Sequence, residues 1–296
     1  MRKPAVRPAA PRQRLIATFR LLRPAPLRRS VVAATVGFAS LAALATAPAA
    51  AADLASHRAV YEMKLSTSKR SSGVIAVDGA MTMEIADACE GWEVRQRIQL
   101  KFQRDDGEQF VTDSSFTSYE AKDGQAFQFS IRNIQDGEVD EELRGRAELP
   151  PDGPGRAEFT QPQQRSFELP PGTLFPTRHL EVLIESARAG ETVIEVRVFD
   201  GARLDGALRV AAAISKATRL PAGPAPRGDA TLLRGQQAWT VRLAFYPAGD
   251  SEPQPDYEVS MVMLANGVAR ALTLDYSDFA IEGRLVQVER LPRPKC

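Results

Sequence analysis

The chain has 296 residues, of which 25% are charged, and its 38 basic residues nearly balance its 37 acidic ones. Nine of the basic residues and none of the acidic ones lie in residues 1–52, so the remaining 244 residues carry 29 basic against 37 acidic side chains. The resulting net charge of about −8 excludes electrostatic binding of nucleic acid or of an anionic membrane surface by this part of the chain. Its length suffices for one large domain or two small ones.

Residues 1–52 have the order of a secretory signal peptide. A basic segment is followed by the apolar run VVAATVGFASLAALA (31–45) and then by the small residues TAPAAAAD, which is the order that signal peptides share. The apolar run of 15 residues is shorter than the roughly 20 that a membrane-spanning helix needs. We therefore predict an exported protein that is cut near Ala50–Ala52 and does not span a membrane once mature. An uncleaved N-terminal anchor is the alternative.

The two cysteines, Cys89 and Cys296, are 207 positions apart. An exported protein reaches an oxidising compartment, where two distant cysteines most simply form a disulfide. We therefore predict a Cys89–Cys296 bridge that holds the last strand and the terminus against an early hairpin. Two unpaired thiols are the alternative.

Alternation of apolar and polar residues dominates the rest of the chain. In residues 92–103 the apolar side chains fall on one parity and the charged ones on the other, which predicts a strand with one buried face. The same period recurs in residues 75–85, 127–131, 194–198 and 239–245.

Turn signals separate these alternating runs. They are Asp106-Gly107, Asp123-Gly124, Asp136-Gly137, Asp200-Gly201 and Asn266-Gly267. Such pairs between alternating runs favour hairpins. We predict roughly a dozen antiparallel strands that curl into a barrel, a spiral or a sandwich in order to cover the apolar face.

The alternation changes phase near the end of the chain. Leu272 and Leu274 fall on one parity, whereas Ile281 falls on the other. An extra residue in a strand shifts the parity of the side chains that follow it. We therefore interpret Ser277-Asp278 as a β-bulge.

One segment breaks the period of two. In FPTRHLEVLIESARAGE (175–191) the apolar residues fall at positions i, i+3, i+4 and i+7, which predicts an amphipathic helix of about three turns. Pro176 near its start and Gly190 at its end are typical of helix ends. The apolar face comprises Leu180, Leu183, Ile184 and Ala187. In a chain of strands, we expect this helix to close the mouth of a barrel or to pack on the open face of the sheet.

Residues suited to catalysis or metal binding are few. His57 and His179 are the only histidines, so a zinc site or a serine hydrolase triad lacks its usual residues. We expect His179 to face solvent or to cap the helix. The adjacent acidic pairs Asp105-Asp106 and Glu141-Glu142 leave a carboxylate-dependent cell-wall hydrolase as an alternative. We predict no cofactor and no metal.

Trp92 and Trp239 lie on the apolar parity of their strands. Packing in the core is the favoured interpretation. The alternative is that they line a cavity inside the curled sheet, together with Leu180, Leu183 and Ile184 of the helix. Such a cavity would suit an apolar ligand such as a lipid or a peptide.

Five segments share their order and spacing with one known family. They are HRAVYEMKL (57–65), GAMTMEIADACEGWEVRQRIQLKF (79–102), LPPGTLFPTRHLEVLIESARAGE (169–191), VFDG (198–201) and LANGVARALTLDYSDFAIEGRLVQVERL (264–291). Together they resemble the EipB family of α-proteobacteria. The resemblance implies a periplasmic protein of about fourteen antiparallel strands curled around a central helix. It also implies a role in envelope integrity, a tetratricopeptide-repeat partner in the periplasm, no enzymatic activity, and a disulfide at the positions of Cys89 and Cys296.

We therefore predict an all-β protein whose single domain, residues 53–296, curls roughly 12–14 strands around one amphipathic helix. The predicted function is non-enzymatic, namely to maintain the cell envelope by binding or scaffolding its components. A periplasmic carrier that holds a lipid or a lipopeptide inside the curled sheet is the alternative among binding proteins. No nucleic acid partner is predicted.

Overall fold

The computed structural model describes residues 53–219, 224–248 and 254–296. The predicted signal peptide, residues 1–52, lies outside the described residues, so its cleavage and the start of the predicted domain stay predictions. The strands are β1 (His57–Ser68), β2 (Val74–Asp87), β3 (Gly91–Arg104), β4 (Gln109–Ala121), β5 (Ala126–Gln135), β6 (Glu138–Glu148), β7 (Gly155–Gln161), β8 (Arg165–Leu169), β9 (Thr173–Leu174), β10 (Val193–Val198), β11 (Leu208–Ile214), β12 (Arg227–Gly228), β13 (Ala238–Tyr246), β14 (Tyr257–Leu264), β15 (Ala269–Asp275) and β16 (Phe279–Arg290). The helical elements are α1 (Pro176–Ala189) and two short 3₁₀ turns, η1 (Arg70–Ser72) and η2 (Ala230–Leu232).

All these strands belong to one 16-stranded sheet. Its order is β8-β7-β6-β5-β4-β3-β2-β1-β16-β15-β14-β13-β11-β10-β9, with β12 beside β16. Neighbouring strands are antiparallel except for the pairs β9–β10 and β12–β16. Leaving aside β9 and β12, which have two residues each, fourteen strands remain. The predicted all-β, antiparallel sheet with one α-helix is confirmed for the described residues.

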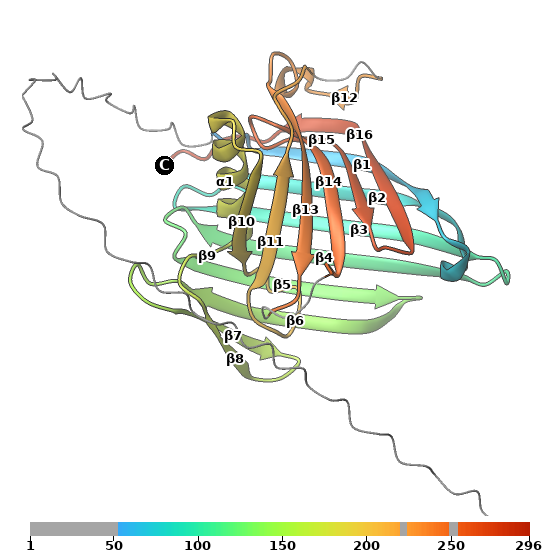
Figure 1. Ribbon diagram of the computed structural model, residues 1–296, viewed down its shortest axis with the longest axis horizontal. Coiled ribbons are helices and arrows are strands. Elements are labelled where there is room, and N and C mark those ends of the chain that lie inside the picture. The colour runs from blue at the N-terminus through green and yellow to red at the C-terminus, as the bar shows by residue number, and fades with distance from the viewer. Residues whose placement is uncertain (1–52, 220–223, 249–253) are drawn as a thin grey trace, which may run out of the picture. The chain divides into compact units, whose positions relative to one another are not determined.

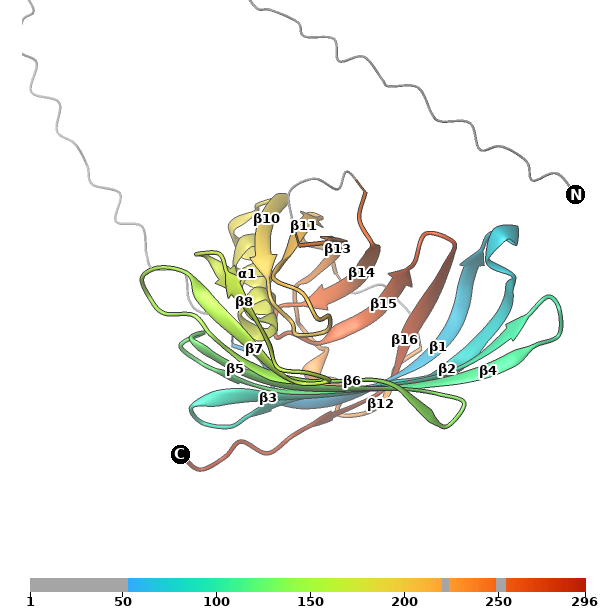
Figure 2. The same ribbon diagram turned by 90° about the horizontal axis from the view of Figure 1, so that it is seen from below.

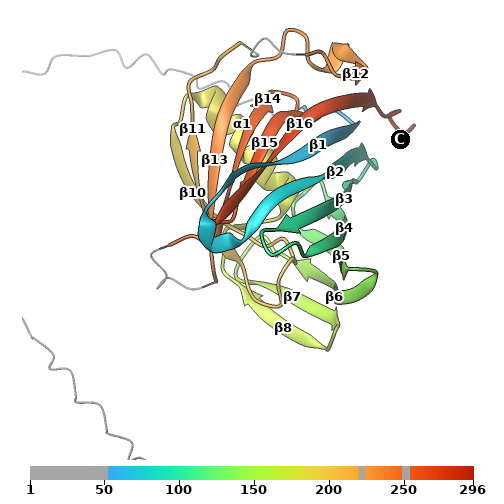
Figure 3. The ribbon, with the colours of Figure 1, turned by 90° about the vertical axis from the view of Figure 1, so that its right-hand side faces the viewer.

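The sheet joins two meanders, β1–β8 and β10–β16, through the pairing of β1 with β16. The register of this pair shifts between Val60 and Tyr61 and again between Leu65 and Thr67, and such irregularities bend strands. Strands β1–β6 run in directions that cross those of β10, β11 and β13–β15, and the two groups lie on two sides of α1 (Figure 1). The views from below and from the right show the same curl around the helix (Figure 2, Figure 3). Side chains on the concave face of this barrel-like sheet therefore point into the interior of the fold.

The predicted alternation separates the two faces of the sheet. In β3, Trp92 and Phe102 are buried on the concave side, whereas Arg95 and Arg97 are exposed on the convex side. All five Asp-Gly and Asn-Gly steps lie between consecutive antiparallel strands: those at residues 106–107, 123–124, 136–137 and 266–267 in short turns, and Asp200-Gly201 in the longer connection between β10 and β11. Local patterns of this kind therefore fix most of the hairpins.

The interpretation of Ser277-Asp278 as a β-bulge is wrong. These residues form the turn between β15 and β16, and Asp275 pairs with Ala280 across it. Ser277 has a φ of 69°, in the left-handed region that tight turns use. A turn changes the parity of the following side chains in the same way as an inserted residue does, so parity alone could not distinguish the two.

Helix α1 begins and ends where the sequence predicts. Pro176 is its first residue, and Gly190 follows its last residue with a φ of 81°. The N–H of Gly190 donates to the carbonyl oxygens of Ala187 and Ser186, which satisfies acceptors that a helix end leaves free.

The predicted disulfide between Cys89 and Cys296 is present, with a Cα–Cα distance of 5.8 Å. Cys89 lies in the turn between β2 and β3 and has a φ of 65°. After β16, the N–H of Leu291 donates to the carbonyl of Ser56 over 3.0 Å. The bridge thus holds the segment that follows β16 against the β2–β3 hairpin.

We expect a protein with both Cys89→Ser and Cys296→Ser to be less stable than the wild type by up to about 5 kcal/mol, because the bridge restricts a very long loop in the unfolded chain. Urea denaturation without reductant measures the difference. As a control, dithiothreitol should lower the stability of the wild type and leave the double variant unchanged. Equal stability of the two proteins without reductant would contradict a structural role for the bridge.

Candidate functional site

The concave face encloses a cavity of about 510 Å³ beside the first turn of α1. Its walls come from the inner faces of β1–β5, β10 and β13–β15, and from Pro176, His179 and Leu180 of the helix. The volume lies within the range of roughly 300–1,000 Å³ that small-molecule sites have. The cavity is therefore the first candidate for a ligand site.

The cavity walls are mainly apolar. Met83, Ile98, Phe116 and Met261 line it, and each stays only half-buried although its strand directs it into the fold. Inward-facing apolar side chains are normally covered by the protein itself. Their incomplete burial marks an apolar surface that the packed chain leaves open.

Glu120 of β4 fixes the helix that closes one side of this cavity. Its side chain is 2% exposed, and its two carboxylate oxygens accept hydrogen bonds from the backbone N–H groups of Thr177 (2.6 Å) and Arg178 (2.7 Å). The residue that precedes the helix, Phe175, has no side chain able to cap it. Glu120 therefore supplies from the sheet the acceptor and the negative charge that a helix N-terminus favours.

Burial raises the pKa of Glu120 to about 7, and the nearby carboxylate of Glu181 acts in the same direction. The two backbone hydrogen bonds favour the ionised form and only partly offset the burial. The carboxyl group consequently changes its protonation state near neutral pH while it holds the helix.

His57 and His179, the two histidines of the chain, both line the cavity. The expectation that His179 faces solvent or caps the helix is wrong, because the side chain is 6% exposed. Burial lowers its pKa to about 4, and burial also lowers the pKa of His57. His179 lies four residues before Leu183 and therefore on the buried face of the helix. The helical period thus indicated that His179 is buried, although its residue type indicated exposure.

Other polar groups in the cavity wall already have partners. The hydroxyl of Tyr61 donates to the carbonyl of Ala269 over 2.8 Å. Ser114 donates to the side-chain oxygen of Asn133 over 2.6 Å, and the amide of Asn133 donates to Glu141 over 3.0 Å. These bonds hold the inner faces of β4, β5 and β6 in register and leave little hydrogen-bonding capacity free.

The sequence-predicted residues occupy two different places. Leu180 lines the cavity. Trp92, Trp239, Leu183 and Ile184 do not; they pack together in a buried cluster beside it, because α1 fills this end of the curled sheet. The lining residues that periodicity did not single out, such as Phe116 and Met261, come from strands that are far apart in the chain.

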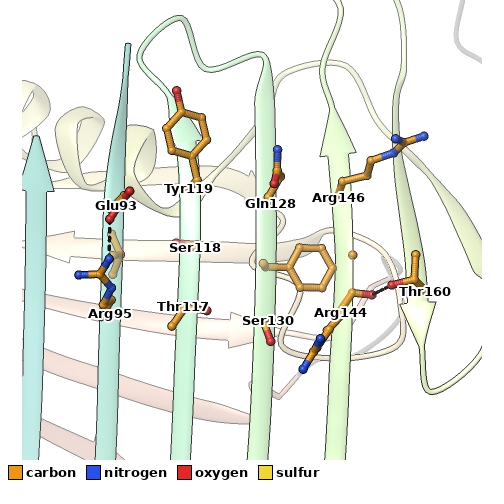
Figure 4. Close-up of a pocket in the computed structure, with 13 residues that line it drawn as sticks. Glu93, Arg95, Thr117, Ser118, Tyr119, Gln128, Ser130, Arg144, Arg146 and Thr160 are labelled. Atoms are coloured by element: carbon orange, nitrogen blue, oxygen red, sulfur yellow. Dashed lines mark hydrogen bonds and ion pairs between the residues drawn. The ribbon is translucent and has the colours of Figure 1, made fainter. Parts of the chain in front are cut away.

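A second hollow, of about 700 Å³, lies on the convex face of β3–β7 (Figure 4). Its charged groups are engaged with one another or with neighbours, as in the ion pairs of Arg95 with Glu93 (2.7 Å) and of Arg146 with Glu158 (2.9 Å). The ring of Tyr119 covers Gly91, where a Cβ atom would come within 2.4 Å of the ring. This open hollow, whose charged side chains are already paired, has fewer features of a ligand site than the interior cavity.

The fold and the cavity together define a class of all-β proteins in which a curled sheet encloses one α-helix and an apolar cavity of ligand size. The family model described as EipB-like matches residues 48–292, and the chain belongs to this family.

The chain is 34% identical over 262 residues to the cell envelope integrity protein EipB of Brucella abortus (strain 2308), and the match covers 86% of this chain and 89% of that protein. A crystal structure of a beta-barrel-like protein of a domain of unknown function, also from Brucella abortus, matches with a TM-score of 0.74 and 31% identity. That match covers 82% of this chain and 100% of the other.

Within residues 53–219, 224–248 and 254–296, no helix is long and apolar enough to cross a membrane. In the same ranges, no group of three or more His, Cys, Asp or Glu side chains is placed to hold a metal ion.

We expect the contribution of Glu120 to the free energy of unfolding to fall as the pH rises from about 4.5 to 7, because the raised pKa of Glu120 means that the folded state binds this proton more tightly than the unfolded state. The full contribution is about 3 kcal/mol, present at low pH and lost above pH 7. Glu120→Gln removes this titration and keeps one acceptor for the helix.

Urea denaturation of the wild type and of Glu120→Gln at pH 5 and pH 8 measures the effect. The variant should gain stability relative to the wild type as the pH rises, whereas the control Glu93→Gln, on the convex face of β3, should not. A difference between the wild type and Glu120→Gln that is the same at both pH values would contradict the assignment.

Proposed function

We propose that the chain is a periplasmic, non-enzymatic protein that supports the integrity of the cell envelope by holding the acyl chain of a lipid or lipopeptide in its interior cavity. The observation that carries the proposal is the apolar cavity surface, with inward-facing Met83, Ile98 and Met261 left half-buried. An acyl chain would cover this surface and gain the free energy of burying apolar area. Flexible methionine side chains suit ligands of irregular shape.

The relative from Brucella abortus supports the cellular role, since it is named a cell envelope integrity protein and covers most of this chain. Residues 1–52, with their signal-peptide pattern, support export to the periplasm. Envelope lipids and lipopeptides are amphiphiles that cross an aqueous compartment only when their acyl chains are shielded, which is the property that an interior apolar cavity supplies.

Binding is favoured over hydrolysis by the residues that line the cavity. A two-carboxylate hydrolase needs a facing pair of acids, whereas Asp200 is the one carboxylate among the described lining residues. The acidic pair Asp105-Asp106 lies exposed in the turn between β3 and β4. A tetratricopeptide-repeat partner stays a prediction.

Ser114 and Ser115 offer a matched test of cavity binding. They are adjacent on β4, but Ser114 lines the cavity whereas Ser115 lies on the opposite face. Ser114→Phe should fill part of the cavity and weaken binding of the apolar fluorescent probe N-phenylnaphthylamine about tenfold, and Ser115→Phe should leave the affinity unchanged.

Fluorescence titration of the three proteins measures the affinities, and circular dichroism verifies that each is folded. Native mass spectrometry of the protein from a periplasmic extract adds an independent readout, since a retained lipid adduct is expected. Absence of probe binding by the wild type, or an equal loss in both variants, would contradict the proposed function.

A further inference from the structure

The cavity lining contains no cationic side chain that could hold an acid. Among the described residues that line it there is no lysine and no arginine, and Asp200 contributes a carboxylate. The carboxylate of Glu120 lies buried at the N-terminus of α1, where it accepts hydrogen bonds from the backbone N–H groups of Thr177 and Arg178, the two residues before His179. Transfer of an unpaired charge into such a site is costly, so an anionic group would find no favourable partner there.

Two polar groups of the lining have unused hydrogen-bonding capacity. The Nε2 atom of His179 is buried and has no hydrogen-bond partner among the described residues. His57 donates from Nδ1 to the carbonyl of Ala55 over 2.7 Å, since a carbonyl oxygen can only accept. With Nδ1 protonated, the neutral imidazole of His57 has a free acceptor at Nε2.

A buried polar atom without a partner is costly, and such atoms are rare unless a ligand or water satisfies them. The position of His179 is set by the first turn of α1, where its own backbone N–H donates to the carbonyl of Phe175 over 2.9 Å. The helix thus holds this imidazole at the cavity wall regardless of whether a ligand is bound.

The charge of the two imidazoles decides what they can bind. Burial lowers the pKa of both rings, that of His179 to about 4. Both are therefore neutral at pH 7, and a neutral imidazole pairs well with a hydroxyl, an ester or an amide. It lacks the positive charge that would compensate a buried carboxylate or phosphate.

We propose that the cavity selects amphiphiles whose acyl chain is followed by an uncharged hydrogen-bonding group, such as the ester or hydroxyl of an acylglycerol, and that His179 binds this group. The inference rests on the proposed function, because it names the class of amphiphile that the same cavity takes. Free fatty acids in their anionic form are excluded by the same lining.

Displacement of N-phenylnaphthylamine from the wild type tests the selection. At pH 7, monodecanoylglycerol should displace the probe at least about tenfold more strongly than decanoate, which has the same acyl chain and a charged end. Both ligands are used below their aggregation limits. Equal displacement by the two would overturn the inference while leaving acyl-chain binding intact.

The role of His179 is tested by two variants. His179→Leu should weaken binding of monodecanoylglycerol about tenfold more than it changes binding of the apolar probe, because the probe does not depend on the hydrogen bond that the substitution removes. His179→Gln, which keeps a hydrogen-bonding side chain, should restore most of the affinity for monodecanoylglycerol.

The outcomes separate the two proposals. If the wild type binds neither the probe nor monodecanoylglycerol, the proposed function fails and this inference fails with it. If the probe binds but His179→Leu retains full affinity for monodecanoylglycerol, the assignment of His179 fails alone. The comparison of monodecanoylglycerol with decanoate uses only the wild type, so it holds even if a variant does not fold.

Discussion

A sheet of this size has one apolar face that must be kept from water, and the rest of the structure follows from how that face is covered. The pairing of β1 with β16 brings two meanders into one sheet, and the curl turns the apolar residues of both toward each other. Helix α1 fills one end of the interior, where Leu183, Ile184 and Trp239 are buried. The interior beyond the helix is the cavity, which exists because a single helix cannot fill the space that so many strands enclose.

The position of helix α1 depends on Glu120, an ionisable side chain that is buried in the interior of the fold. Glu120 reaches from β4 to the backbone N–H groups of Thr177 and Arg178, so the sheet itself provides the cap that the preceding residue lacks. This contact fixes where the first turn of α1 lies, and therefore where His179 and Leu180 meet the cavity. Stability and ligand recognition are linked through this carboxylate, because the same turn that it holds forms one wall of the site.

The sequence predicts the elements well because their signals are local. Alternation in β3, Asp-Gly turns, and the proline and glycine that bound α1 each act within a few residues. The cavity is different, because Trp92 and Leu180 would show the same periodicity in a filled interior as in an open one. Its volume depends on how β10, β11 and β13–β15 cross β1–β6, which no local pattern encodes. The position of His179 on the helix indicated burial, whereas its polar side chain indicated exposure to solvent. The prediction followed the side chain and was wrong.

The pairing of the first and last long strands, which joins the two halves of the sheet, also determines the order in which the fold can form. Glu62 and Arg284, which form an ion pair across β1 and β16, are 222 positions apart. Contacts so distant in the chain are slow to form, so one edge of β1 stays unpaired until nearly all of the chain is available. An open strand edge invites pairing with another molecule, and charged residues on the strand oppose it. The open edge of β1 is protected from such pairing during folding by its charged residues, Arg58, Glu62 and Lys64. In the folded protein the same residues form part of the surface.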